Sequence, residues 1–167
     1  MAVWYMNLKD NRIDNSRNND EELKFRICME KSVLAIGWGI NADFDSWRDY
    51  RELADLYYKG STKYKTAVNA LSKMSCGDLV WIRNPVAHSR YLAQVLDDEP
   101  SLCCNLREFD LFSYRKADIY GVDEGQMGQY GLLKEKPTGR HAIERIGKQE
   151  LINATERLFE SIIQSRS

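Results

Sequence analysis

Residues 77–97 read GDLVWIRNPVAHSRYLAQVLD, and the spacing of the two apolar runs in this stretch decides the fold. Residues 77–83 and 91–97 are rich in the branched and aromatic side chains that favour strands. The segment between them, residues 84–90, is too short for the helical crossover that parallel strands need. The spacing therefore predicts an antiparallel hairpin, and it favours a curved sheet over a doubly wound parallel one.

The rest of the chain alternates between strand-like and helix-like patterns. Apolar runs predict further strands at residues 2–8, 33–38, 109–117 and 119–122, with short ones at 129–133 and within 139–146. Helical spacing predicts helices at residues 21–31, 45–59, 61–74 and 149–163. The polar residues 9–20, rich in Asn and Asp, are expected to form a loop.

The ends and faces of these helices give further expectations. Asp20 is placed to cap the first helix, and Ser61 or Thr62 the third. One stripe of the second helix is expected to be buried; it consists of Trp47, Tyr50, Leu53, Ala54 and Tyr57. The order of elements predicts a single α/β domain of the α+β kind over residues 1–167. We expect a small, mostly antiparallel β-barrel of about six strands flanked by helices.

Composition narrows the class of protein. The chain has 167 residues, 43% of them hydrophobic and 29% charged, which is ordinary for a soluble globular domain. The formal net charge of −1 gives no bulk attraction to nucleic acid or to a membrane surface. No apolar run is long enough to span a membrane, and the first residues have no signal-peptide pattern. We therefore predict a cytoplasmic protein with no membrane partner.

Cysteine and histidine are too sparse and too irregularly spaced to indicate a metal site. Cys28, Cys76, Cys103 and Cys104 form no C-x-x-C pair, and a tetrahedral zinc site needs converging pairs. The sequence therefore predicts four reduced thiols, no metal and no cofactor. His88 beside Ser89 suggests a nucleophile, but no G-x-S-x-G motif accompanies the pair.

Residues 32–40 read SVLAIGWGI and place Trp38 between two glycines at the end of an expected strand. Because glycine has no bulk, both faces of the indole are left less crowded, and a ligand has room to stack there. The alternative is that Trp38 is a core residue, the usual fate of a tryptophan after a buried strand. The other tryptophans, Trp4, Trp47 and Trp81, are interpreted as packing residues.

The ordered set VWYMNL, AIGWG, AVNALSKMSCGDLVWIR and YLAQVLDD resembles the PUA-like superfamily, especially its EVE and YTH branches. The most specific parts are IGWG at residues 36–39 and MSCGDLVWI at 74–82. The resemblance covers most of the chain and implies one PUA-like domain over residues 1–167. It also implies a reader of modified or flipped bases in DNA or RNA. By family analogy, the setting is microbial or phage defence or restriction.

The resemblance also implies the residues of a base-binding pocket. Trp38 matches a tryptophan that forms one wall of the pocket in the YTH branch, and the end of the first strand lies beside it. The predicted base-binding residues are Trp38, Asn7, Met6, Leu8, Gly37 and Gly39. Residues 97–108 lack the further tryptophans that the YTH branch places there, which implies a differently walled pocket.

Basic residues next to the barrel strands are the candidates for contacts with the nucleic-acid backbone. These candidates are Arg83, Arg90, Arg115 and Lys116. A second group, Lys63, Lys65 and Lys73, is either a solvated helix face or an edge that contacts phosphates.

The predicted function is thus a non-enzymatic nucleic-acid-binding domain that captures a modified or flipped base in an aromatic pocket. Two alternatives stay open. One is a protein-binding module, such as a phage-encoded inhibitor of a host complex, which the near-neutral charge fits as well. The other is a small nuclease of the ASCH type, for which the sequence offers no assembled set of catalytic residues.

Overall fold

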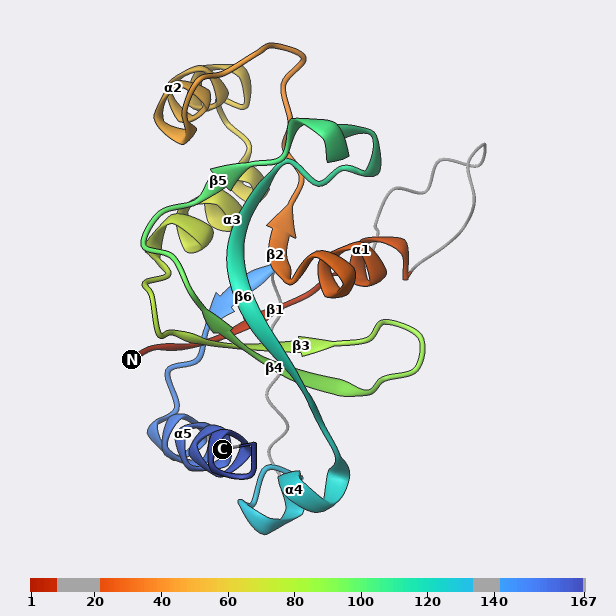
Figure 1. Ribbon diagram of the computed structural model, residues 1–167. Helices are drawn as coiled ribbons and strands as arrows, with labels where there is room; N and C mark the ends of the chain where they lie inside the picture. Colours follow the sequence, from red (N-terminus) through yellow and green to blue (C-terminus); the bar gives the residue numbers. More distant parts are fainter. Residues whose placement is uncertain (9–21, 134–141, 167) are drawn as a thin grey trace.

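The computed structural model describes residues 1–8, 22–133 and 142–166 (Figure 1). The expected loop at residues 9–20, and Asp20 as a helix cap, lie outside the described residues. Of the described residues, the strands are β1 (Val3–Met6), β2 (Val33–Ile36), β3 (Leu79–Arg83), β4 (Arg90–Val95), β5 (Ser101–Leu102), β6 (Ser113–Val122) and β7 (Ile143–Arg145). The α-helices are α1 (Leu23–Lys31), α2 (Trp47–Tyr57), α3 (Thr62–Lys73), α4 (Glu124–Gln129) and α5 (Gln149–Gln164), and η1 (Cys104–Phe109) is a 3₁₀ helix.

The strands form one curled sheet in the order β2-β6-β4-β3-β1-β7, with β5 added beside β6. The pair β1–β3 is parallel, and the other pairs are antiparallel, including the expected hairpin of β3 and β4. Within the described residues no pairing joins β2 to β7, so the sheet is a half-barrel and not the closed barrel that we expected. Its mixed α/β character and mostly antiparallel pairing agree with the prediction.

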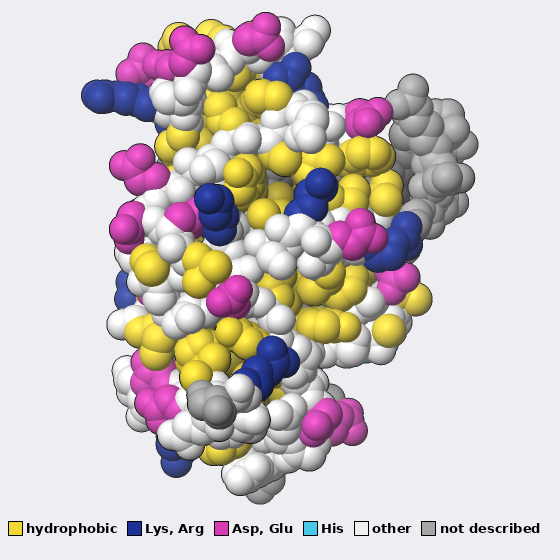
Figure 2. Space-filling view, viewed as in Figure 1, with side chains coloured by type: hydrophobic (Ala, Val, Ile, Leu, Met, Phe, Trp, Pro, Cys, Tyr) yellow, Lys and Arg dark blue, Asp and Glu magenta, His cyan; other side chains and the backbone are white. Residues whose placement is uncertain are grey.

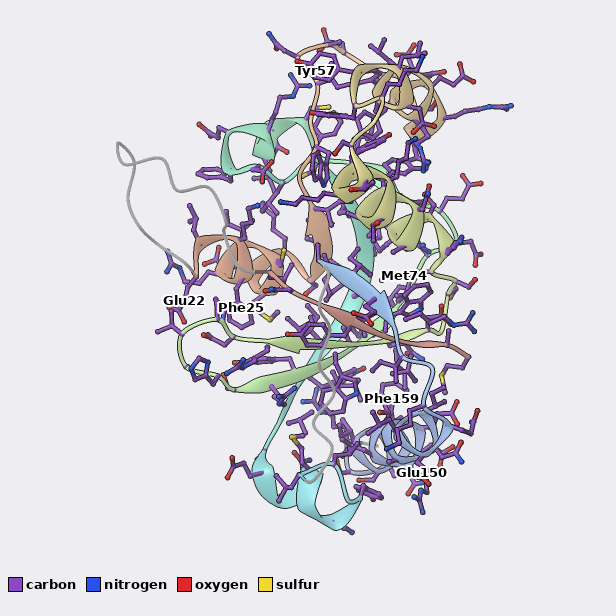
Figure 3. The ribbon with its side chains drawn as sticks, turned by 180° about the vertical axis from the view of Figure 1, so that it is seen from behind. Glu22, Phe25, Tyr57, Met74, Glu150 and Phe159 are labelled. Atoms are coloured by element: carbon purple, nitrogen blue, oxygen red, sulfur yellow. The ribbon has the colours of Figure 1, made fainter. Side chains whose placement is uncertain are left out.

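Both faces of the sheet are covered, and a separate hydrophobic core lies on each. On the concave side, Met6 and Ile82 belong to a core that the helices α1, α2 and α3 share. On the other side, Trp81 packs with residues of α4 and α5, and Figure 3 shows Phe159 on the side of α5 that faces the sheet. Strands buried on both faces need continuous apolar sequence, which accounts for the unbroken runs VWYM and LVWI.

Strand β6 is one continuous strand where we expected two. Its first half pairs with β2 and its second half with β4, so it carries the curl of the sheet. Asp118 does not interrupt it, because this side chain is exposed on the outward side of the strand. The predicted start was wrong, since Phe109 ends η1 and Asp110 takes a left-handed conformation with φ 54° before the strand begins.

The strand expected at residues 129–133 is also wrong, because α4 and a turn occupy this region. Asp123 and Gln126 form a capping box, in which each side chain accepts a hydrogen bond from the backbone N–H of the other residue. Gly131, with φ 76°, then reverses the chain and buries Leu132 in the outer core. In the part of the chain that the structure describes, no helix combines the length and the apolar character needed to cross a membrane.

Candidate functional site

Trp38 follows β2 in a backbone conformation that side chains rarely adopt. Its φ of 69° lies in the left-handed region, where a bulky residue is an outlier. Two hydroxyl groups hold this turn in place. The Tyr50 hydroxyl donates to the Trp38 carbonyl oxygen, and the Tyr58 hydroxyl donates to the Gly39 carbonyl oxygen, each at 2.7 Å. The surrounding structure therefore fixes a conformation that Trp38 alone would not favour.

The indole of Trp38 is half-buried and lies against two tyrosine rings. Its centroid is 5.4 Å from that of Tyr58 and 5.9 Å from that of Tyr64, both in edge-to-face arrangements. The two tyrosine rings stack on each other with centroids 4.9 Å apart. We call Trp38, Tyr58 and Tyr64 the Trp38 cluster. Such contacts restrict the rotation of the indole and leave part of it accessible.

Hydrogen bonds fix the tyrosines in turn. The Tyr64 hydroxyl donates to Asp55 Oδ1 at 2.8 Å, and Arg51 Nε donates to the same oxygen at 2.9 Å. Burial raises the pKa of both Tyr50 and Tyr64 above the ordinary value, and for Tyr64 the hydrogen bond to Asp55 acts in the same direction. Both hydroxyls therefore stay protonated donors at neutral pH.

The glycines beside Trp38 have a packing role that we did not predict. A Cβ on Gly37 would lie 2.1 Å from Asp110 Oδ1, and one on Gly39 would lie 3.1 Å from Arg107 Cγ. Helix η1 and the segment after it thus fill the space that the missing side chains leave. Both glycines are therefore required by the close approach of this part of the chain.

The predicted neighbours of Trp38 on the first strand differ in exposure. Met6 is fully buried and Leu8 is 2% exposed, and both belong to the core cluster against which Trp38 packs. Their side chains are packing residues in this structure. Asn7 is exposed, and its backbone N–H donates to the Ala142 carbonyl oxygen at 2.8 Å. A role for Asn7 in reading a base edge stays a prediction.

Arg115 does not fit the predicted contact with a nucleic-acid backbone. Its side chain is 0% exposed, and Nε donates to Asp97 Oδ1 at 2.7 Å. Nη1 donates to the carbonyl oxygens of Leu71 and Met74 at 3.0 and 2.5 Å. The residue holds α3 against β6, so its guanidinium is occupied inside the protein.

The other residues that we predicted to contact a nucleic-acid backbone lie nearer the protein surface than Arg115. Lys116 is exposed, and Arg83 is half-buried. Arg83 and Arg90 are cross-strand partners beside the loop that connects β3 to β4. Arg90 is 9% exposed, and burial, with the nearby charge of Arg83, lowers its pKa below the ordinary value. Contact of Arg83, Arg90 and Lys116 with phosphates stays a prediction.

A surface hollow of about 860 Å³ lies between β1, α3 and β7. We call it the α3–β7 hollow; its lining includes Trp4, Lys65, Lys73, Cys76, Asp78 and Arg145. Sequence reasoning did not find this site. The one signal was the choice left open for Lys65 and Lys73, which both line this hollow.

A buried carboxylate in the wall of the hollow joins three parts of the chain by hydrogen bonds. Asp78 is 5% exposed and accepts hydrogen bonds from the Ala2 N–H at 2.7 Å, Trp4 Nε1 at 2.9 Å and the Ser75 N–H at 3.1 Å. The carboxylate of Asp78 thus accepts three hydrogen bonds from within the protein, which partly offset its charge. Arg145 lies over the Trp4 ring, with its guanidinium carbon 6.0 Å from the ring centroid.

Neither metal chemistry nor a likeness to known proteins identifies the site. Among the residues that the structure describes, no group of three or more His, Cys, Asp or Glu side chains is placed to hold a metal ion. The four cysteines are free thiols in the structure. Comparison of the chain with protein-family models, curated proteins and solved structures finds no significant match. The PUA-like assignment therefore stays a prediction.

Proposed function

We propose that this chain is a non-enzymatic nucleic-acid-binding protein of PUA-like type that captures an unpaired, modified or extruded base on Trp38. The observation that carries the proposal is the left-handed backbone of Trp38, held by the hydroxyls of Tyr50 and Tyr58. A left-handed L-residue costs about 1–2 kcal/mol, and such strain is concentrated at binding sites. The strained backbone sets the direction in which the half-buried ring projects, and this supports a role for the ring in binding.

The Trp38 cluster provides what base stacking requires. Stacking of one base on an aromatic side chain contributes roughly 1–3 kcal/mol, and it does so for any base because each has a π-face. Edge contacts from Tyr58 and Tyr64 already order the indole, so little side-chain entropy is lost on binding. Asn7 has both a donor and an acceptor with which to read a base edge.

The surface charge fits a ligand that is recognised mainly by its bases. Figure 2 shows Lys and Arg side chains dispersed among Asp and Glu on this face of the molecule, in keeping with the net charge of −1. A protein without a broad basic surface gains little from sequence-independent attraction to duplex nucleic acid. Extrusion of a base costs least where the base is already unpaired or damaged. We therefore propose a single strand, or a damaged or modified site, as the ligand.

The test compares Trp38→Ala with Trp47→Ala, since Trp47 is also a half-buried tryptophan but packs on Tyr50 in α2. Binding of single-stranded DNA and RNA oligonucleotides, with and without base modifications, is measured by fluorescence anisotropy. We expect Trp38→Ala to weaken binding roughly 5- to 150-fold, the equivalent of one lost stacking interaction. Trp47→Ala should bind like the parent.

Thermal melting separates this proposal from a purely structural role for Trp38. A fully buried tryptophan typically contributes 3–5 kcal/mol of stability, so its removal lowers the melting temperature strongly. A melting temperature of Trp38→Ala far below that of Trp47→Ala would therefore contradict the proposal.

Absence of binding by the parent to every oligonucleotide would favour a protein-binding module instead. One observation supports that second candidate. Leu53, Leu56 and Tyr57 on the outer face of α2 are 41%, 71% and 69% exposed, although Leu53 and Tyr57 belong to the stripe that we expected to be buried. Figure 3 shows Tyr57 at the end of the molecule opposite α5. Exposed apolar side chains on a helix are typical of a docking surface.

A further inference from the structure

We infer that the α3–β7 hollow binds phosphate groups of the strand whose base is captured at Trp38. This inference rests on the proposed function and adds the path of the ligand across the surface. Helix α3 connects the two places, because Tyr64 contacts Trp38 while Lys65 and Lys73 line the hollow. At 1.5 Å per residue, Tyr64 and Lys73 are separated by about 14 Å along the helix, so one short oligonucleotide can reach both.

The charge of the hollow suits a phosphodiester anion. Lys65, Lys73 and Arg145 are exposed cations on two different elements, α3 and β7, that lie side by side. Asp78 is the acidic residue of the lining, and its three hydrogen bonds within the protein partly offset its charge. The hollow therefore presents a local excess of positive charge on a chain whose net charge is −1.

Neutral side chains in the hollow can also donate hydrogen bonds, which would orient a phosphate that the cations attract. Thr66, Asn69 and Ser75 also line the hollow. The amide oxygen of Asn69 already accepts a hydrogen bond from Arg51 Nη2 at 2.5 Å, which leaves its NH₂ group to donate. Hydroxyl and amide donors beside Lys and Arg are the groups that proteins use to position a nucleic-acid backbone. A volume of about 860 Å³ also lies within the usual range for ligand sites.

The first experiment counts phosphate contacts through salt dependence. Affinity for a single-stranded oligonucleotide is measured from low to high salt for the parent, Lys65→Gln, Lys73→Gln and Arg145→Gln. The matched control is Lys63→Gln, which removes an exposed lysine of the same helix outside the lining. Each hollow variant should reduce the slope of log K against log salt by about 0.7, the value for one phosphate on a single strand. Lys63→Gln should leave the slope unchanged.

Cys76 offers a second measurement, because this exposed thiol lies in the hollow while the exposed Cys104 lies on η1 outside it. Alkylation of each thiol is followed by mass spectrometry with and without the oligonucleotide. The bound oligonucleotide should slow the alkylation of Cys76 several-fold and leave that of Cys104 unchanged. Shielding of Cys76 by inorganic phosphate but not by the oligonucleotide would overturn the inference in favour of a free phosphate ligand.

The outcomes separate this inference from the proposed function. If Trp38→Ala weakens binding but the hollow variants behave like Lys63→Gln, the inference fails and base capture stands. If the hollow variants reduce the slope and Trp38→Ala binds like the parent, the hollow is a phosphate site but Trp38 captures no base. A protein that binds no oligonucleotide and shows no shielding of Cys76 overturns both.

Discussion

Gly37 lacks a side chain because Asp110 occupies the space into which one would project. A Cβ at this position would lie 2.1 Å from Asp110 Oδ1 and 2.8 Å from the Asp110 carbonyl oxygen. Asp110 cannot easily move away, since Oδ2 forms an ion pair with Lys24 Nζ at 2.5 Å. The close approach of the segment after η1 to the end of β2 therefore depends on glycine at this one residue.

We predict that Gly37→Ala lowers the free energy of unfolding by about 1–3 kcal/mol, the usual cost of forcing extra atoms into a packed site. The matched control is Gly121→Ala in β6, where the nearest atom to an added Cβ is 3.9 Å away. Urea denaturation measures both variants. Equal stability of the two would show that the segment carrying Asp110 adjusts freely, and Gly37 would then be no requirement of the fold.

Besides the pairing of β6 with β2, β4 and β5, the buried side chain of Arg115 joins this strand to α3 and to the segment after β4. The guanidinium donates to Asp97 after β4 and to the carbonyl oxygens of Leu71 and Met74 at the end of α3. These carbonyls belong to the last turn of a helix, where orphan acceptors and the helix dipole both favour a cation. One buried side chain thus fixes three segments of the chain relative to one another.

We predict that Arg115→Met destabilises the protein by about 3–5 kcal/mol, because Asp97 and the helix carbonyls then lose a buried charged partner. Lys116→Met is the control; this neighbouring side chain is exposed, and its loss should change stability by less than about 0.5 kcal/mol. Chemical denaturation gives both values. A double variant, Arg115→Met with Asp97→Leu, should regain part of the loss, and its failure to do so would contradict the ion-pair explanation.

Elements with local signals were predictable from the sequence, and those defined by distant partners were not. The hairpin of β3 and β4 follows from its short connection, and α3 begins at the expected cap, where the Ser61 hydroxyl accepts from the Tyr64 N–H. By contrast, β1 pairs with β3 in parallel across a long stretch of sequence. Both strands are buried on two faces, so no alternation of polar and apolar residues indicates which strand lies beside them.

The candidate site shows the same limit. The sequence predicted a strand that ends at Trp38, whereas β2 ends at Ile36 and Trp38 follows it. Its partners Tyr58, at the end of α2, and Tyr64, in α3, reach it through packing that no spacing encodes. The α3–β7 hollow combines β1, α3 and β7, which only the folded sheet brings together. Asp123 and Gln126 have the spacing of a capping box, a local signal for α4 that our prediction of a strand at residues 129–133 did not use.

The whole molecule is a sheet with a hydrophobic core on each side. The core on the concave side contains three ionisable side chains that are uncharged at neutral pH. Cys28 is fully buried there, and burial raises the pKa of its thiol from 9.0 to about 11. Tyr50 and Tyr64 are also buried, and their pKa values are raised as well. None of these groups can ionise without water entering the core or the chain unfolding.

The free energy of unfolding should therefore fall at alkaline pH. A variant that removes the Cys28 thiol can detect the contribution of this one group. Above pH 9 the unfolded chain loses the Cys28 proton while the folded chain keeps it. This contribution to stability is complete below pH 9 and is lost as pH rises through about 11. For a shift of this size the loss by pH 11 is about 2 kcal/mol. Ionisation of Tyr50 and Tyr64 in the unfolded state adds to it above about pH 10.

We predict that the free energy of unfolding of Cys28→Ala falls less steeply than that of the parent between pH 8 and pH 11, by about 2 kcal/mol in total. Cys104→Ala, which removes an exposed thiol, should follow the parent throughout. Urea denaturation at intervals of half a pH unit measures the three curves. Deletion of a buried side chain also lowers the stability of Cys28→Ala at every pH, so the comparison concerns slopes and not absolute values. Parallel curves for Cys28→Ala and the parent would mean that water reaches the thiol in the folded protein, and the concave core would then be open to solvent at α1.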